Sequence, residues 1–395
     1  MVNSKIHNVI VVIDPGHGGD NLGADYNNVL EKDINLIVCL SLYEELVQYE
    51  GIDVYLTRDE DRELSLLERA EFAEEKNADF LFCYHFNMSV SHDLFGTEVW
   101  VNSQKELYQQ GTSFSQIQIE SMTSLGFYNR GIKTKLNDSG TDYYGILRNC
   151  AQFNIPAVLI EHGHLDHLND SIYFDEVEEL IEIGKINATN IAKYYQLSSE
   201  SLGTDYSNYN VPIVTTSDEI VAPDYSEPDL CHISMIDTNY NTGTITIYIE
   251  GNDMDSRILY FSYSLDGGEF FTELFPWPED TYAFEYTIHI PTGETPMVQV
   301  KIDNLFDLEL ESNILVYEPF DYATEVATAE IGADISTMGT TEAPWVIEDT
   351  INNLGAEPDG MITFLYISCS IAIGTFISVL LLKLSKKKRT RNRYK

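Results

Sequence analysis

The sequence is poor in cysteine and in positive charge. Its 395 residues include only five cysteines, and no two of them lie within ten residues of each other. This spacing excludes a C-x-x-C redox or zinc motif and a disulfide framework, so we interpret the cysteines as small apolar side chains. Lysine and arginine number 23 against 64 aspartates and glutamates, which gives a formal net charge of −41. Such an acidic chain repels phosphate backbones, and nucleic-acid binding is therefore excluded.

Long apolar runs are also absent, with one exception near the carboxyl end. Met361–Leu382 has 22 residues and no charge, which is long enough for a transmembrane helix. The 13 residues after it, 383–395, carry eight basic side chains and no acidic one. Basic residues beside a span mark its cytoplasmic side. These features predict a single-pass protein of the cell membrane, with residues 1–360 outside the cell and a basic cytoplasmic tail.

The first half of the chain alternates short apolar runs with longer amphipathic stretches. The apolar runs predict strands at Val9–Ile13, Val54–Thr57, Phe80–Tyr84, Thr97–Val101 and Val158–Ile160. The amphipathic stretches predict helices at Leu30–Tyr49, Leu64–Lys76, Glu106–Leu125 and Ser171–Tyr195. Strands that alternate with helices are typical of a layered, largely parallel sheet flanked by helices. We therefore predict an α/β catalytic domain over residues 1–196.

The composition changes at residue 197. Residues 197–227 are rich in Ser, Thr, Asp and Pro, and we interpret them as a linker. Residues 228–317 alternate apolar and polar side chains, most clearly in Thr244–Glu250, and turn signals separate the runs. This pattern predicts a small all-β, Ig-like sandwich. Residues 318–360 are acidic and predict an extended stalk, so we expect the β-domain and stalk to act mainly as a spacer.

Four ionisable side chains stand where predicted strands end or where a predicted helix begins. His17 follows the first strand among glycines, and His85 and Glu161 end two other strands. Glu31 lies in the first turn of a helix, where a favourable interaction with the helix dipole is an alternative explanation. A structural role for His17 is equally open. Two histidines and one glutamate at one sheet edge would match a catalytic zinc site, and a second glutamate would serve proton transfer.

At these residues the sequence resembles the zinc-dependent N-acetylmuramoyl-L-alanine amidases, the peptidoglycan hydrolases of bacterial cell walls. The resemblance covers residues 8–196 and depends on five motifs in the family's order. These are IDPGHGG, LEKDINL, SLLERAEFAEEKNADFLFCYHFN, GTEVWV, and the closing segments GILR and PAVLIEHG. The resemblance implies that His17, Glu31 and His85 bind Zn²⁺ and that Glu161 is the catalytic residue.

The sequence departs from the family pattern near two of these residues. Cys83 stands two residues before His85, where the family more often has serine. His164 stands where family members often have an apolar or aromatic residue. Together with His162 and His167 it adds potential ligands, which we interpret as rim or surface histidines because a three-ligand set already exists. No departure removes a catalytic residue, so an active enzyme is favoured over a degenerate one.

The resemblance implies hydrolysis of the peptidoglycan amide bond between N-acetylmuramic acid and L-alanine. We also predict that Asn87 and Arg148 bind substrate, although Arg148 could instead pair with a surface acid. Two alternatives stay open. One is a non-catalytic wall-binding or adaptor protein on an amidase-like scaffold, and the other is a zinc peptidase or deacetylase that acts on other wall amides. The predicted partners are peptidoglycan and, through the carboxyl-terminal helix, the membrane.

Overall fold

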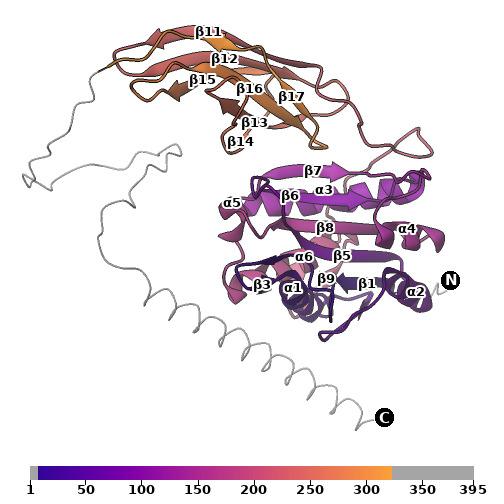
Figure 1. Cartoon of the computed structure of the whole chain (residues 1–395). Helices are drawn as coiled ribbons and strands as arrows, with labels where there is room; N and C mark the ends of the chain where they lie inside the picture. The colour runs from indigo at the N-terminus through magenta and orange to yellow at the C-terminus, as the bar shows by residue number, and fades with distance from the viewer. Residues whose placement is uncertain (1–7, 323–395) are drawn as a thin grey trace, which may run out of the picture. The chain divides into compact units, whose positions relative to one another are not determined.

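The computed structural model describes residues 8–322 (Figure 1). Over that range no helix is both long and apolar enough to cross a membrane. The predicted span 361–382, the basic tail 383–395 and nearly all of the predicted stalk lie outside the described residues. We therefore correct the predicted cell-membrane location and the predicted membrane partner, because the described structure contains no helix that supports either.

A six-stranded sheet forms the centre of the first part of the chain, in the order β4-β1-β5-β8-β6-β7. Its strands are β1 (Val9–Pro15), β4 (Ile52–Leu56), β5 (Phe80–Asn87), β6 (Thr97–Val101), β7 (Asn129–Lys133) and β8 (Ala157–His164). Neighbouring strands are parallel except β6 and β8, which pair antiparallel. The predicted α/β domain is confirmed, and its single antiparallel pairing makes the sheet mixed.

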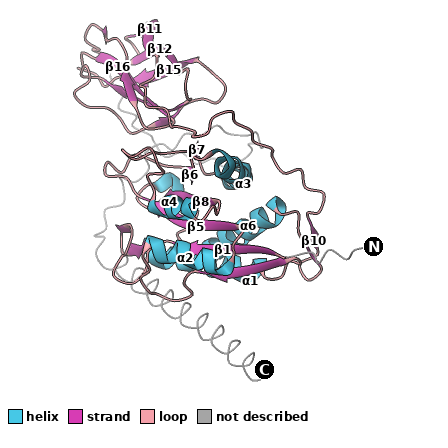
Figure 2. Cartoon of the chain, turned by 90° about the vertical axis from the view of Figure 1, so that its right-hand side faces the viewer, coloured by secondary structure: helices cyan, strands magenta, loops and turns pink. Residues whose placement is uncertain are grey.

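Helices cover both faces of this sheet (Figure 2). Phe80, Phe82 and Tyr84 of β5 pack in one core with the first set of helices, and the alternate residues Leu81 and Cys83 pack in another core with the second set. The first set is α1 (Glu31–Leu46), α3 (Lys105–Leu125) and α6 (Val177–Tyr194), and the second is α2 (Leu66–Lys76) and α4 (Gly145–Gln152). Three cysteines, Cys39, Cys83 and Cys150, are free and buried in these cores, and the Cys83 thiol also donates to Asp14 Oδ2 at 3.0 Å.

Local sequence signals explain where several elements begin and end. Helix α2 begins with a capping box, in which the Ser65 side chain accepts from the Glu68 N–H and the Glu68 side chain accepts from the Ser65 N–H. It ends at Asn77, whose backbone is left-handed. The remaining short elements of this part are the hairpin β2 (Asp25–Tyr26) and β3 (Val29–Leu30), the helix α5 (Leu168–Ser171), and the pair β9 (Ser198–Ser199) and β10 (Thr204–Asp205).

The segment predicted as a linker contacts the α/β domain. The backbone N–H of Lys105 donates to the Glu219 carbonyl at 3.0 Å, and the N–H of Val221 donates to the Ser103 carbonyl at 2.8 Å. These bonds fasten residues 219–221 beside the start of α3. The domain boundaries drawn from the sequence stay predictions, because the described α/β domain and the strands that follow belong to one compact unit ending at Tyr322.

Two antiparallel sheets follow, which we call the β-region (residues 228–320). One sheet contains β11 (Leu230–Asn239), β12 (Thr244–Asn252) and β15 (Ala283–His289). The other contains β13 (Ile258–Ser264), β14 (Phe275–Pro276), β16 (Met297–Asn304), β17 (Glu309–Glu311) and β18 (Leu315–Val316). Alternate residues of β12 and β16 share one apolar core, as the period-two pattern predicts. An Ig-like arrangement stays a prediction.

Candidate metal and catalytic site

Two buried arginines shape the loop that presents His17. Arg58 Nη2 donates to the Gly16 carbonyl at 2.8 Å, and Arg69 Nη1 donates to the Pro15 carbonyl at 2.7 Å. Arg69 Nη2 donates to the carbonyl of His17 itself at 2.7 Å. The His17 backbone is left-handed, with φ of 61°, a conformation that is uncommon for residues other than glycine. The arginines hold the carbonyls around His17 in place and so help to maintain this conformation.

Gly16 makes room for the second histidine. A Cβ atom at position 16 would overlap the His85 imidazole. The φ angle of Gly16 is not left-handed, so the space taken by the imidazole, and not the backbone conformation, requires glycine here. The ends of the adjacent strands β1 and β5 therefore bring His17 and His85 together, with their ring centroids 4.8 Å apart.

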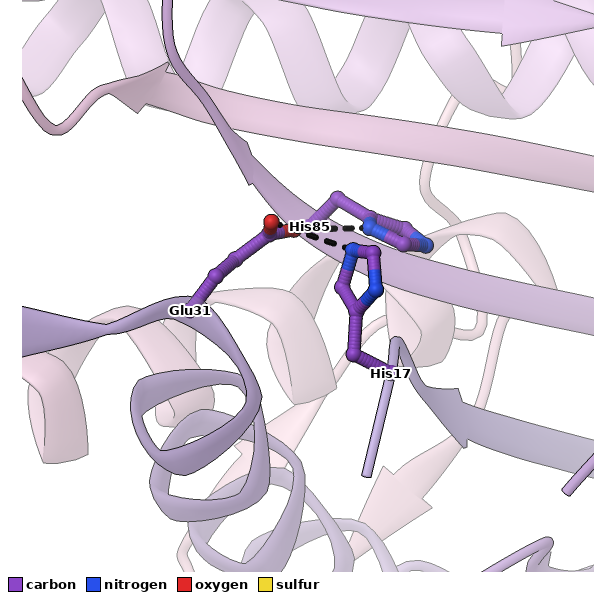
Figure 3. A group of neighbouring side chains, drawn as sticks. All are labelled: His17, Glu31 and His85. Carbon is purple, nitrogen blue, oxygen red and sulfur yellow. Dashed lines mark hydrogen bonds and ion pairs between the residues drawn. The ribbon is translucent and has the colours of Figure 1, made fainter. Parts of the chain in front are cut away.

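Glu31, the first residue of α1, faces both histidines (Figure 3). Its Oε2 lies 3.0 Å from His17 Nε2, and its Oε1 lies 2.8 Å from His85 Nδ1. Burial alone would raise the pKa of Glu31, but the two imidazoles outweigh that effect and hold it well below its usual range. One ligand atom from each of the three side chains lies within 4.8 Å of the others.

The donor set fits a zinc ion. Two imidazole nitrogens and one ionised carboxylate oxygen are the His₂Glu ligands of catalytic zinc sites, which keep a further position for water or substrate. Backbone N–H groups orient the carboxylate, because Ala24 donates to Glu31 Oε2 at 2.8 Å and Phe86 donates to Oε1 at 3.2 Å. Asn21 Oδ1 lies 2.8 Å from His17 Nδ1, which leaves Nε2 directed at Glu31.

Glu161 lies beside this group, on strand β8. It pairs with His85 in the register of β5 and β8. Its Oε2 is buried and has no hydrogen-bond partner among the described residues. Burial raises the pKa of Glu161 well above its usual range, and the negative charges of Glu31 and Glu98 act in the same direction. A pocket of about 300 Å³ is lined by the three candidate ligands and by Glu161.

The two predicted substrate contacts lie in different places. Asn87 lines the pocket together with the candidate ligands. Arg148 is not among the residues that line it, and its Nη1 donates to the carbonyls of Asp142 and Tyr143, each at 2.8 Å. Arg148 thus fastens the turn that leads into α4. A substrate role for either residue stays a prediction.

The interpretation of His162 and His164 as rim or surface histidines is wrong. Both are fully buried, because β8 continues through Glu161 as far as His164. The His162 ring contacts the carbonyl of His85 and the amide of Asn187, and burial lowers the pKa of His162 to about 4. His162 is therefore a neutral core residue behind the site. His167 is half-buried and caps the start of α5.

The sequence reasoning missed Glu98, a buried carboxylate on β6 directly opposite Glu161. Its Oε2 accepts from Lys133 Nζ at 2.7 Å and from Arg130 Nε at 3.0 Å. Its Oε1 accepts from Asn87 Nδ2 at 3.2 Å and from the Trp100 indole at 3.0 Å. The available signal was an acidic residue inside the otherwise apolar stretch GTEVWV.

Lys133→Met is expected to lower the free energy of unfolding by about 3–5 kcal/mol, the usual cost of breaking a buried ion pair from one side. Lys133 and Glu98 are both nearly inaccessible to solvent, so removing the ammonium leaves Glu98 short of one counter-charge. Urea unfolding of the full chain measures this loss. Lys185→Met, which breaks an exposed pair with Glu182, is the matched control and should cost under about 0.5 kcal/mol. Equal losses in the two variants would contradict the role of the buried pair.

Comparison with known proteins shows which family the chain resembles. Residues 11–193 match the family model described as N-acetylmuramoyl-L-alanine amidase. The uncharacterized protein YqiI of Bacillus subtilis is 31% identical over 185 residues, which are 47% of this chain and 84% of that protein. The sporulation-specific N-acetylmuramoyl-L-alanine amidase of the same species is 30% identical over 196 residues, which are 49% of this chain and 71% of that protein.

A solved structure, the catalytic domain of the amidase CwlV from Bacillus (Paenibacillus) polymyxa, is 26% identical with a TM-score of 0.42, and the match covers 48% of this chain and 99% of that one. The sporulation-specific amidase decides the assignment, since it is 30% identical and the chain covers 71% of its length, and the family model agrees with it. The chain is an enzyme that belongs to the N-acetylmuramoyl-L-alanine amidase family.

Proposed function

We propose that the chain hydrolyses the amide bond between N-acetylmuramic acid and L-alanine in peptidoglycan, with Zn²⁺ held by His17, Glu31 and His85. One observation carries the proposal, namely that these three side chains and Glu161 line a single pocket. Membership of a family of amidases that are generally zinc-dependent supports it. A zinc ion held by these three residues would act as a Lewis acid toward water and the scissile carbonyl.

Glu161 is the group in the pocket that can move a proton. Its Oε2 has no other partner among the described residues and is therefore free to accept a proton from the attacking water. The same oxygen then donates that proton to the nitrogen of the leaving L-alanine. Because the carboxyl group is buried, its protonated form is well stabilised between these two steps.

The other residues of the pocket hold the reacting groups in place. Glu31 keeps its two oxygens directed at the histidines, because backbone N–H groups of Ala24 and Phe86 fix the carboxylate. Asn87 places its side chain at the pocket wall, and Glu98 fixes the orientation of that amide. In this proposal the Asn87 side chain contacts the muramoyl or peptide part of the substrate.

The test is digestion of purified peptidoglycan by the zinc-loaded full chain. We expect new amino termini of L-alanine, no release of acetate, and loss of the reaction when the metal is chelated. An adaptor protein would create no amino termini, a peptidase would expose a residue other than L-alanine, and a deacetylase would release acetate. Any of these three results would contradict the proposed function.

A further inference from the structure

Arg130 of β7 bonds both to Glu98 in the α/β domain and to Asp307 in the β-region. Its Nε donates to Glu98 Oε2 at 3.0 Å. Its Nη2 donates to both carboxylate oxygens of Asp307, at 3.0 and 2.9 Å, in the turn between β16 and β17. The Arg130 side chain is almost fully buried, whereas the Asp307 side chain is 38% exposed, so the bonds between them lie at the outer edge of the buried group. Both Asp307 oxygens therefore accept from one guanidinium nitrogen, in charge-assisted hydrogen bonds that tie the turn to Arg130.

A packed apolar contact surrounds Arg130. Tyr260 of β13 is fully buried, and its hydroxyl accepts from Arg130 Nη1 at 3.2 Å while donating to the Phe95 carbonyl just before β6. Phe95, Leu259 and Tyr260 form one buried apolar cluster with residues of both parts. Tyr128 also donates its hydroxyl to the Leu259 carbonyl. The two parts of the compact unit are therefore joined by specific contacts in a solvent-excluded region.

The buried charges balance only when the β-region is included. Within the α/β domain, Glu98 carries one negative charge and is paired with two cations, Lys133 and Arg130. That trio alone has a net charge of +1 in a buried place, and an uncompensated buried charge is strongly destabilising. Asp307, which is partly exposed at the edge of this group, supplies the second negative charge. The β-region thus completes a charge cluster that begins in the α/β domain.

The same cluster reaches the wall of the pocket. Glu98 accepts from the side chain of Asn87, which lines the pocket, and lies opposite Glu161 in the pairing of β6 and β8. The neighbouring residue Thr97 donates its hydroxyl to the Glu161 carbonyl at 3.0 Å. A shift of the Glu98 side chain would therefore move the Asn87 amide that bonds to it. A shift of the β6 backbone at Glu98 would move Glu161, its partner in the strand pairing.

We propose that Asp307 and Tyr260 are positioning residues of the amidase site. They fix Arg130, and through Arg130 and Glu98 they hold Asn87 and Glu161 in place. This inference rests on the proposed function, since the position of Glu161 matters most if that residue transfers a proton. It gives the β-region a role beyond the spacer that the sequence predicts.

The experiment compares Asp307→Asn with Glu309→Gln in the zinc-loaded full chain. Glu309 lies two residues further along, pairs with Lys301 and is exposed, so its variant removes a nearby charge without touching Arg130. We expect Asp307→Asn to lower kcat by about tenfold on peptidoglycan, with little change in KM or zinc content. Glu309→Gln should stay within about twofold of the wild type.

Hydrogen exchange separates this inference from the proposed function. In Asp307→Asn, the backbone amides of 86–88 and 97–101 should exchange about tenfold faster than in the wild type, and those of Glu309→Gln should not. Tyr260→Phe, which keeps the ring and loses the hydroxyl, should show a smaller effect in the same segments. If the wild type proves inactive on peptidoglycan, the proposed function fails, and faster exchange at both segments still supports the contact with the pocket wall.

Two results would overturn the inference. One is exchange in Asp307→Asn that matches that of Glu309→Gln at both segments. The other is faster exchange with an unchanged kcat in an active enzyme, because Asp307 would then stabilise the fold without positioning the site.

Discussion

Glu161→Gln is expected to keep the zinc and to lower kcat by a factor of about 10² to 10⁴. This factor is the usual contribution of a general acid–base residue. Glutamine has nearly the same size but cannot accept the proton, and Glu161 is not among the three candidate ligands. Its buried Oε2 has no partner among the described residues, so little other structure depends on its charge. The measurement is kcat on peptidoglycan at saturating zinc, together with the metal content of the purified protein.

Glu182→Gln is the matched control for that experiment. Glu182 is an exposed residue of α6 that pairs only with Lys185 among the contacts described, and its variant should keep wild-type kcat. A metal-replete Glu161→Gln protein with the turnover of this control would contradict proton transfer by Glu161.

Removing either histidine ligand should abolish metal binding and activity together. His17→Ala and His85→Ala each leave two of the three ligands, too few for the site of a tightly held catalytic zinc ion. We expect the wild type to hold about one zinc per chain and each variant to hold almost none after dialysis, with no measurable hydrolysis. Metal content by elemental analysis and kcat on peptidoglycan are the two measurements.

His232→Ala provides the comparison, since His232 is exposed on β11 of the β-region. It should keep both zinc and turnover. Retention of full zinc and full turnover in either ligand variant would show that the metal is held elsewhere or that the reaction does not need it.

The candidate ligands could be predicted because their positions follow from local sequence. His17 and His85 come at the carboxyl ends of apolar strands, and parallel neighbours in a sheet bring such ends to one edge. Glu31 begins a helix that the sequence predicts from its apolar residues, although α1 is buried on all sides from Ile34 to Leu42. The resemblance then supplied roles that spacing alone left open. Spacing alone did not show that the three side chains meet, because the pairing of β1 with β5 joins segments about 70 residues apart, and the resemblance implied that meeting.

The Glu98 cluster could not be predicted in that way. Its cations come from β7, a strand whose sequence NRGIK shows no clear period-two pattern and which forms at the edge of the sheet by pairing with β6. Its last partner, Asp307, is 177 residues from Arg130 along the chain. A single sequence does not reveal which of many acidic residues meets a given arginine over such a separation.

The wrong interpretation of His162 has a related cause. The apolar run around Glu161 predicts a strand that ends there, but pairing with β5 continues to His164. His162 is buried because its ring can satisfy both nitrogens inside the core, with a carbonyl and an amide. Polar side chains with complete hydrogen bonding can lie inside a protein, and composition does not reveal when those partners are present.

The His85 imidazole fills the space that a side chain at position 16 would need, and this limits how the site can be grafted onto another protein. A designer who grafts the two histidines and the glutamate onto another sheet must also copy a residue that contacts no metal, because any side chain at position 16 occupies the place of the imidazole. Alanine there would be excluded as firmly as a large residue. Positions 16 and 85 must therefore be transferred together, because only glycine at position 16 leaves room for the imidazole at position 85.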